Sequence, residues 1–411
     1  MLTKLLFNNF EMEIIIKQPL RKIQANKWQG HAAIFLCAAI FGLGVSVAQN
    51  VAAKRSAFRS VNINNTQPRR DINGEIIDAH DGCLQFFNGR YYLYGTAYGK
   101  THGYSFNNRF RVYSSADLEH WTFDGELLKT PPDGIYYRPY VVYNPHTRKY
   151  VLWYNWFPKF FEGHVGVAVS DTPAGPFTIV KTAVNVAHAE DGIGDGSLFV
   201  DKDGAGYFIY SVLGMGPTAH AIRHSIYIER LTQDFLGASG QTSELLGTGA
   251  EAPSLFRHDD RYYALFDTTC CFCSAGSGAR VYVASSPLGP YTEGPNINRE
   301  PDGRPIVAAQ QTFVADIPTS SGPAFVWMAD RWNSRPDNIK GHDLQFWSPP
   351  LRFTTDGRIE PINNVSDWHM SILLGRKRDP IKHPYIWPKK YNNPNPLKTD
   401  PCTGAPLPPE D

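Results

Sequence analysis

The sequence predicts an all-β protein, a five-bladed β-propeller, and three observations predict it. A small or polar residue, two or three apolar residues, a turn and an aromatic-rich run recur at intervals of 57, 57, 57 and 58 residues. Propeller blades of four strands have repeat periods of about 40–50 residues, and this period is slightly longer. No long stretch shows helical periodicity. Aromatic residues make up 13% of the chain and charged residues 19%, which suits a large β-rich core.

Each repeat has an anchor residue at the start of its first predicted strand. The anchors are Cys83, Tyr140, Ser197, Ser254 and Thr312. An aromatic-rich second strand follows each of them, for example 91–94 in the first repeat and 150–153 in the second. Later strands such as 167–170 and 283–286 run into Pro/Gly turns and then an aromatic residue, as expected of half-buried strands bounded by turns. The anchors therefore predict five blades in order.

The amino-terminal residues 1–48 resemble a signal peptide. Basic residues precede an apolar stretch, 32–47, and Ser46-Val47-Ala48 offers the small residues that a signal peptidase recognises. The stretch is short for a membrane span, which needs about 20 residues. An uncleaved signal anchor is the alternative. We expect a secreted or periplasmic protein with no other membrane contact.

Three further segments follow the predicted signal peptide. Residues 49–70 form a polar lead-in that could close the ring, and residues 71–378 form the propeller domain. Residues 379–411 contain nine prolines and little alternation, so we expect an irregular tail.

Charge and cysteine content limit the partners. The formal net charge is +1 and no Lys/Arg block stands out, which argues against nucleic acid and favours a neutral or small substrate. The cluster Cys270, Cys271 and Cys273 lacks the spacing of a zinc site. In an oxidising compartment a local disulfide is favoured over a metal, with Cys83 as a further candidate partner.

The residues just before each anchor are the candidates for chemistry. Because the first strand of each blade lines the central channel, these residues should gather on one face around the axis. They are Asp81, Tyr137, Arg138, Asp195, Glu251 and Gln310. The alternative for Asp81 and Asp195 is turn capping, since each precedes a glycine.

Three carboxylates at equivalent places in three blades suit the cleavage of a glycosidic bond. One carboxyl group must donate a proton to the leaving oxygen, and another must be ionised to activate water. Repulsion between neighbouring carboxylates helps one of them to keep its proton. The predicted active site therefore lies at the central axis.

The chain resembles glycoside hydrolase family 43 over roughly residues 71–370. The matching stretches are Ala79-His80-Asp81-Gly82, Asp195-Gly196-Ser197-Leu198-Phe199 and Glu251-Ala252-Pro253-Ser254. The resemblance implies a five-bladed propeller that inverts the anomeric centre. It also implies Asp81 as base, Asp195 as the residue that orients the acid and tunes its pKa, and Glu251 as acid.

Within that family the chain is most similar to the exo-β-1,3-galactanase-like group. Arg138-Pro139, Gln310-Gln311-Thr312-Phe313 and Asp330-Arg331-Trp332 carry this similarity. Two departures stand out. Those galactanases lack the Asp base and use a Gln in blade five, whereas this chain has both Asp81 and Gln310. They also carry a substrate-contacting Glu where this chain has Tyr137.

These observations predict an inverting glycoside hydrolase for plant or algal polysaccharides or oligosaccharides of galactan, arabinan or xylan type. We expect the carbohydrate to be bound by His80, Tyr137, Arg138, Gln310, Arg331 and Trp332. We expect no metal in the reaction and no cofactor. A structural cation at the propeller axis is the alternative. The alternatives are a non-catalytic carbohydrate-binding propeller and phosphorolysis, which would need clustered basic groups for phosphate.

Overall fold

The computed structural model describes residues 57–409, apart from residues 161, 190, 215–223, 271 and 402, and two short strands near the amino terminus. The chain forms two units, Met1–Ser56 and Ala57–Asp411. In the first unit, β1 (Leu6–Phe7) pairs antiparallel with β2 (Phe10–Glu11). The apolar stretch of the predicted signal peptide lies outside the described residues. In the described part of the chain, no helix is long and apolar enough to cross a membrane.

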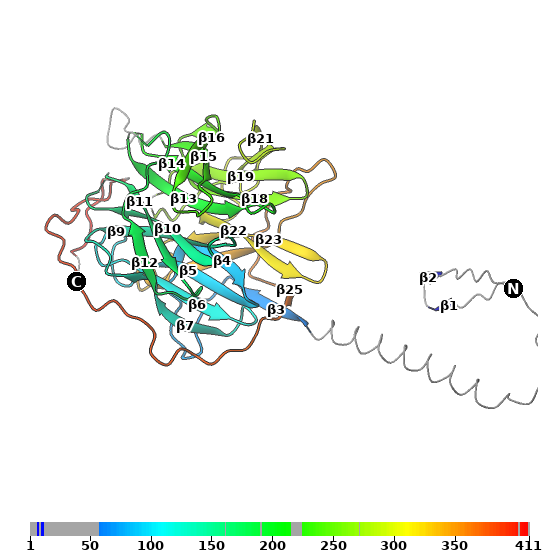
Figure 1. The fold of residues 1–411 in the computed structure, drawn as a ribbon, viewed down its shortest axis with the longest axis horizontal. Helices are drawn as coiled ribbons and strands as arrows, with labels where there is room; N and C mark the ends of the chain where they lie inside the picture. Colours follow the sequence, from blue (N-terminus) through cyan, green and yellow to red (C-terminus); the bar gives the residue numbers. More distant parts are fainter. Residues whose placement is uncertain are drawn as a thin grey trace, which may run out of the picture. The chain divides into compact units, whose positions relative to one another are not determined.

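The second unit is built from five sheets, one for each predicted blade (Figure 1). Blade one holds β4 (His80–Phe87), β5 (Arg90–Ala97), β6 (Arg109–Ser115) and β7 (Trp121–Glu126). Blade two holds β9 (Ile135–Asn144), β10 (Lys149–Phe157), β11 (His164–Ser170), β12 (Phe177–Lys181) and, at its edge, β8 (Leu128–Lys129). Blade three holds β13 (Ile193–Val200), β14 (Gly206–Val212), β15 (Ser225–Leu231), β16 (Ala238–Thr242) and β17 (Gly247–Thr248).

The last two blades complete the set. Blade four holds β18 (Ala250–His258), β19 (Arg261–Thr268), β20 (Arg280–Ala284) and β21 (Thr292–Asn296). Blade five holds β22 (Gln310–Thr319), β23 (Gly322–Arg331), β24 (Leu344–Pro350), β25 (Asp367–Leu373) and β3 (Phe58–Asn64). A short 3₁₀ helix, η1 (Lys340–His342), lies between β23 and β24.

The first strands of the blades form a closed ring. β4 contacts β9, β9 contacts β13, β13 contacts β18, β18 contacts β22, and β22 contacts β4 again. This cycle around one axis confirms the predicted five-bladed propeller. Buried tryptophans pack within and between the sheets; Trp121, Trp153, Trp327 and Trp347 are each no more than 1% exposed.

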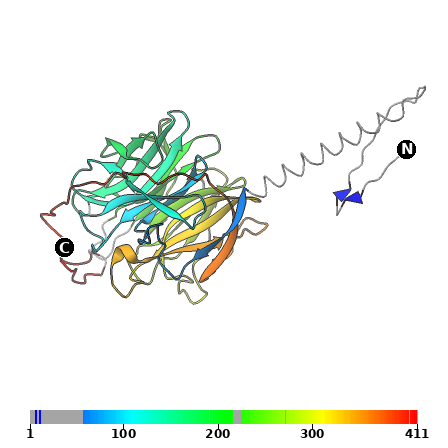
Figure 2. The same cartoon turned by 90° about the horizontal axis from the view of Figure 1, so that it is seen from below.

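The amino-terminal strand β3 joins the last blade. It pairs antiparallel with β25 along its whole length, from Phe58 opposite Leu373 to Asn64 opposite Asp367. β25 also pairs with β22 at one position. Figure 2 shows β3 in blue beside the yellow and orange strands of this blade. The two ends of the propeller sequence therefore meet in one sheet.

Each first strand carries one extra residue near its start. The register shows it between residues 80 and 83 of β4, 137 and 140 of β9, 193 and 196 of β13, 251 and 254 of β18, and 311 and 313 of β22. Such β-bulges bend a strand and turn a side chain out of the regular alternation. The same irregularity occurs in all five blades, near the start of the strand that lines the central axis.

The proline-rich tail packs along blades one and two (Figure 2). The Glu126 N–H donates to the Tyr385 carbonyl at 2.7 Å. Tyr391 is 3% exposed and contacts a cluster formed by Phe106, Ile135, Phe157 and Leu213. The tail therefore packs, through Tyr391, against residues of blade two and of the loop after β14.

Candidate active site

The bulges bring residues of all five blades to one cavity of about 110 Å³. Seven of the residues predicted for the site line it: Asp81, Tyr137, Arg138, Asp195, Glu251, Gln310 and Trp332. Asp81, Arg138 and Ala252 lie inside bulges with positive φ values of 48°, 52° and 55°. Non-glycine residues rarely adopt this conformation, and where they do it often accompanies a functional site.

Asp195 links the blades on either side of it. Its Oδ1 lies 2.8 Å from Nε of Arg138 in blade two, and its Oδ2 accepts the Ala252 N–H of blade four at 3.0 Å. Burial alone would lower the pKa of Arg138, but Asp195, Asp81 and Glu251 together raise it. Arg138 is therefore a fixed positive charge among the three carboxylates.

Glu251 is buried, with 6% of its surface exposed. Its pKa is raised, first because burial disfavours the charged form and second because Asp195 adds a negative charge nearby. Its Oε1 accepts the Cys270 N–H at 2.6 Å and also accepts the side-chain amide of Gln310. These properties suit a carboxyl group that keeps its proton at neutral pH.

Asp81 lies in the same cavity and enters from blade one. Its backbone N–H donates to Oδ2 of Asp330 at 2.6 Å, and its own Oδ2 accepts the Tyr98 hydroxyl. Burial raises its pKa to about 6, opposed by the charge of Arg138. Its Oδ1 has no hydrogen-bond partner among the described residues. Asp81 is therefore largely ionised near neutral pH, and its unpartnered Oδ1 is itself buried.

Gln310 and Tyr137 have their polar groups engaged within the protein. The Trp332 indole N–H donates to Oε1 of Gln310 at 2.6 Å, while the Gln310 amide N–H₂ donates to Glu251. The Tyr137 hydroxyl donates to the Gly103 carbonyl at 3.0 Å. Gln310 therefore links Trp332 to Glu251.

His80 and Arg331 do not belong to the set that lines the cavity. His80 is fully buried behind Asp81, and its Nδ1 lies 3.0 Å from Oδ1 of Asp330. Burial lowers the pKa of His80, but the charge and hydrogen bond of Asp330 raise it overall, to about 9. Arg331 donates to Asn364 at 2.8 Å and lies over the ring of Phe346. The structure thus places both away from the position predicted for a sugar.

The cavity also contains residues that the repeat did not identify. Tyr98, Cys270 and Trp332 line it, and each lies just beyond the second strand of its blade. Residues just after the second strand of a blade therefore also indicate the cavity, as do the residues at the start of the first strand. Tyr104, Phe157, Phe160, Leu213, His224 and Phe272 complete the lining beside Gly194.

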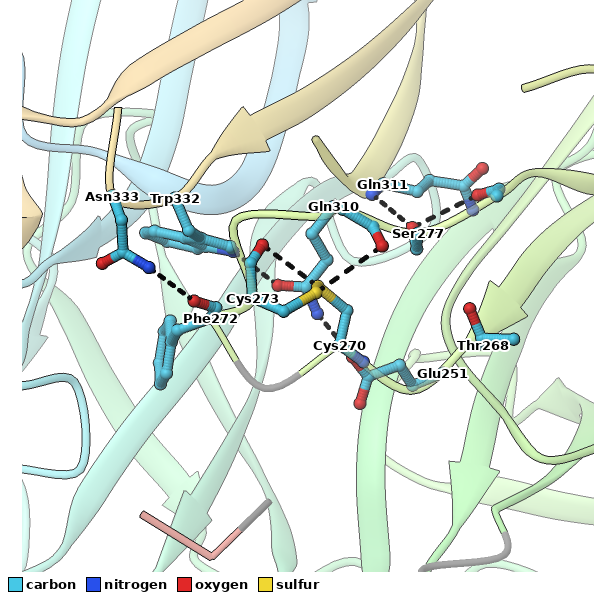
Figure 3. The surroundings of a disulfide bond; sticks show 12 residues. Glu251, Thr268, Cys270, Phe272, Cys273, Ser277, Gln310, Gln311, Trp332 and Asn333 are labelled. Carbon is cyan, nitrogen blue, oxygen red and sulfur yellow. Dashed lines mark hydrogen bonds between the residues drawn. A yellow bond between two sulfur atoms is a disulfide. The ribbon is translucent and has the colours of Figure 1, made fainter. Parts of the chain in front are cut away.

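The cysteine cluster contains a disulfide between Cys270 and Cys273 (Figure 3). The predicted local disulfide is thus present, and Cys83 takes no part in it. Cys83 is a free, fully buried thiol at the start of blade one. Among the described residues, the one group with the spacing of a metal site is Asp117, Glu119 and His120, which lies outside this cavity.

A second, larger cavity of about 820 Å³ lies between blade one and the tail. Asp78, Arg111 and Pro384 are among its lining residues. It contains none of the residues predicted for the axis, so the chemistry is assigned to the smaller cavity.

Comparison with known proteins agrees with this geometry. The model of glycosyl hydrolases family 43 matches residues 76–315, more than half of the chain. A solved family 43 β-1,3-galactosidase with galactodeoxynojirimycin is 25% identical, with a TM-score of 0.63; the alignment covers 74% of this chain and 99% of that one. No match was found among curated protein sequences.

Two further solved structures have the same fold. A second family 43 β-1,3-galactosidase is 26% identical, with a TM-score of 0.63, and the alignment covers 75% of this chain and 64% of that one. An exo-β-1,3-galactanase from Clostridium thermocellum is 24% identical, with a TM-score of 0.63 and coverage of 76% and 67%. The predicted resemblance is confirmed, and this chain belongs to glycosyl hydrolase family 43 and is a glycosidase.

Proposed function

We propose that this glycosidase releases galactose from β-1,3-linked galactosides by a single displacement that inverts the anomeric centre. One observation carries the proposal: a buried Glu251 with a raised pKa shares one axial cavity with an ionisable Asp81, from a different blade. An inverting hydrolase needs one protonated carboxyl group and one ionised carboxylate that activates water on the opposite face of the sugar. The similar solved structures are of β-1,3-galactosidases and an exo-β-1,3-galactanase, which supports the choice of sugar.

In the proposed reaction, Glu251 donates its proton to the leaving glycosidic oxygen as the bond from C1 to that oxygen breaks. Asp81 takes a proton from a water molecule whose oxygen attacks C1 from the opposite face. Asp195 orients Glu251 through the Ala252 amide and raises its pKa, and Arg138 balances the charge of the carboxylates. The products are two sugars with free hydroxyl groups, and the proton balance closes without a cofactor.

The choice of Asp81 over Gln310 as base rests on chemistry and hydrogen bonding. A neutral amide is a far weaker base than a carboxylate. Both ends of the Gln310 amide are already engaged, by Trp332 and by Glu251. Asp81 has an oxygen without a partner among the described residues. We therefore assign Gln310 to the orientation of the acid.

We also propose that the protein acts outside the cytoplasm, on a carbohydrate and not on nucleic acid. The signal-like residues 1–48 and the net charge of +1 support this. The Cys270–Cys273 disulfide supports it as well, because disulfides persist mainly in oxidising compartments.

The test is product release from a panel of galactan, arabinan, xylan and aryl glycosides, with proton NMR of the anomeric signal at early times. We expect activity on β-1,3-linked galactose, with the α-anomer released first. Glu251→Gln should reduce the rate on galactan by several orders of magnitude.

Three outcomes would contradict parts of the proposal. Early release of the β-anomer contradicts inversion. Activity confined to arabinan or xylan contradicts the sugar. Equal rates for wild type and Glu251→Gln contradict the role of the acid.

A further inference from the structure

The two oxygens of Glu251 differ in their surroundings. Oε1 accepts two N–H donors, the Cys270 backbone and the Gln310 side chain. A neutral carboxyl group carries its proton on the oxygen that is not saturated with donors. The transferable proton of Glu251 therefore lies on Oε2, and its direction depends on the two donors that fix Oε1.

The first donor belongs to a four-residue disulfide loop. Cys270 follows the second strand of blade four and is 2% exposed, and its sulfur is bonded to Cys273 (Figure 3). Between them, Phe272 has a φ of 54°, an unfavourable conformation for a residue with a side chain. Without the disulfide, Phe272 would therefore be expected to relax to a more favourable backbone conformation.

The second donor is connected to the same loop through aromatic contacts. The Phe272 ring packs edge-to-face on Trp332, with ring centres 4.9 Å apart, and its carbonyl accepts Asn333 at 3.1 Å. Trp332 in turn donates to Gln310, which donates to Glu251. Lys340 Nζ lies 4.3 Å from the centre of the Phe272 ring. Both donors to Oε1 thus depend on the loop, one directly and one through Phe272 and Trp332.

We propose that the Cys270–Cys273 disulfide is a positioning element for the acid, so that full activity requires its oxidised state. This inference rests on Glu251 being the acid. A disulfide that closes so short a loop restricts the unfolded chain less than one that closes a long loop. Its main effect is therefore local, on the Cys270 amide and on Phe272.

The charged and titratable groups around Glu251 come from other elements. Asp195 from β13, Arg138 from β9 and Tyr104 from the connection between β5 and β6 interact with it electrostatically. Asp81, Tyr98, Tyr137 and His224 line the same cavity. Reduction of the disulfide adds no charge to this set below the pKa of a thiol. Relaxation of the reduced loop would move the Cys270 N–H, a donor that favours the ionised carboxylate, away from Oε1. Glu251 should then hold its proton to higher pH.

The experiment is reduction of the folded wild-type enzyme with dithiothreitol. The reagent supplies two electrons and two protons, becomes a cyclic disulfide and leaves Cys270 and Cys273 as thiols. Alkylation and mass spectrometry verify the change. We expect kcat on a β-galactoside to fall by roughly ten- to hundredfold, and the basic limb of the pH profile to move to higher pH, while the far-ultraviolet circular dichroism stays the same.

Two variants serve as controls. C270S/C273S should show the same loss and the same shifted profile without reductant, and no further response to it. C271S keeps the pair and should respond to reductant as the wild type does. If the double variant does not fold, the reduction of the folded wild-type enzyme alone tests whether activity requires the disulfide.

A reduced and alkylated enzyme with unchanged kcat and an unchanged basic limb would overturn the inference. A loss of kcat with an unmoved basic limb would also overturn it, since a general loosening of the fold produces that result. If Glu251→Gln is as active as wild type, the proposed function fails instead, so the two failures are distinguishable.

Discussion

At the scale of single residues, the site depends on pairs that hold each candidate catalytic group in place. Asp330 receives the backbone N–H of Asp81 on one oxygen and the His80 ring on the other. Asp195 does the same for Arg138 and the Ala252 amide. Each of these carboxylates fixes a residue in a β-bulge, where the backbone would otherwise relax.

The His80–Asp330 pair makes stability depend on pH. The folded-state pKa of His80, about 9, lies above its unfolded value of 6.5. The stabilisation is therefore fully present below pH 6.5 and is lost as the pH rises through 9. A shift of this size corresponds to about 3 kcal/mol. Denaturant titrations at several pH values should show the free energy of unfolding falling over that range.

Asp330→Asn should lower the free energy of unfolding near pH 6 and flatten this dependence. His342→Gln is the matched control, because the His342–Asp337 pair is more than a third exposed on both sides and should contribute little. Parallel curves for wild type and Asp330→Asn would contradict the assignment.

The repeat predicted which residues meet in one cavity, while their roles stay predictions. The anchors located Asp81, Arg138, Asp195, Glu251 and Gln310, because equivalent positions in a propeller converge on its axis. The repeat indicated Asp81 and not His80. His80 was predicted in addition, to bind the carbohydrate, but the structure places it outside the set that lines the cavity. Arg331 and Trp332 were predicted together from the family resemblance, although these adjacent residues have different surroundings.

At the scale of elements, the irregular segments, namely the disulfide loop and the tail, contribute to the cavity or pack against the residues that line it. The pairing of Cys270 with Cys273 could not be read from three cysteines within four residues, because loop geometry selects the partner. The tail had no periodicity to indicate burial. Tyr391 nevertheless packs against Phe157 and Leu213, which also line the cavity.

The tail should therefore contribute to stability through Tyr391. Tyr391→Ala removes a buried ring and its hydrogen bond to the Pro131 carbonyl. We expect a loss of about 3 kcal/mol and a lower melting temperature, measured by calorimetry. Ile386→Ala is the matched control, since Ile386 is 50% exposed in the same tail. Equal melting temperatures for the two variants would show that the tail does not support the propeller.

At the scale of the propeller, closure of the ring connects distant parts of the sequence. β3 lies in the polar lead-in that the sequence suggested could close the ring, and it completes blade five through β25. The burial of Val61 and Ile63, 1% and 3% exposed, shows why alternation in this strand matters. The 57-residue period gave the number of blades, but it does not extend to this strand and could not establish its partner.

Damage to β3 should therefore weaken the whole propeller and not only its edge. Ile63→Ala should cost about 3 kcal/mol, and loss of activity and loss of circular dichroism should coincide on heating, as a cooperative transition requires. Asn62→Ser, with an exposed side chain in the same strand, should match wild type. Activity that survives beyond the structural transition would contradict closure by β3.

Rates on substrates with different leaving groups separate the roles that we propose for Glu251 as acid and Asp81 as base. Glu251→Gln should be nearly inactive on a β-1,3-galactobiose, whose leaving alcohol needs a proton, yet retain much of its rate on dinitrophenyl β-galactoside, whose leaving group does not. Asp81→Asn should lose activity on both, because water activation is needed in each case. If Asp81→Asn retains activity on either substrate while Gln310→Ala loses it on both, Asp81 is not the base and the account is contradicted.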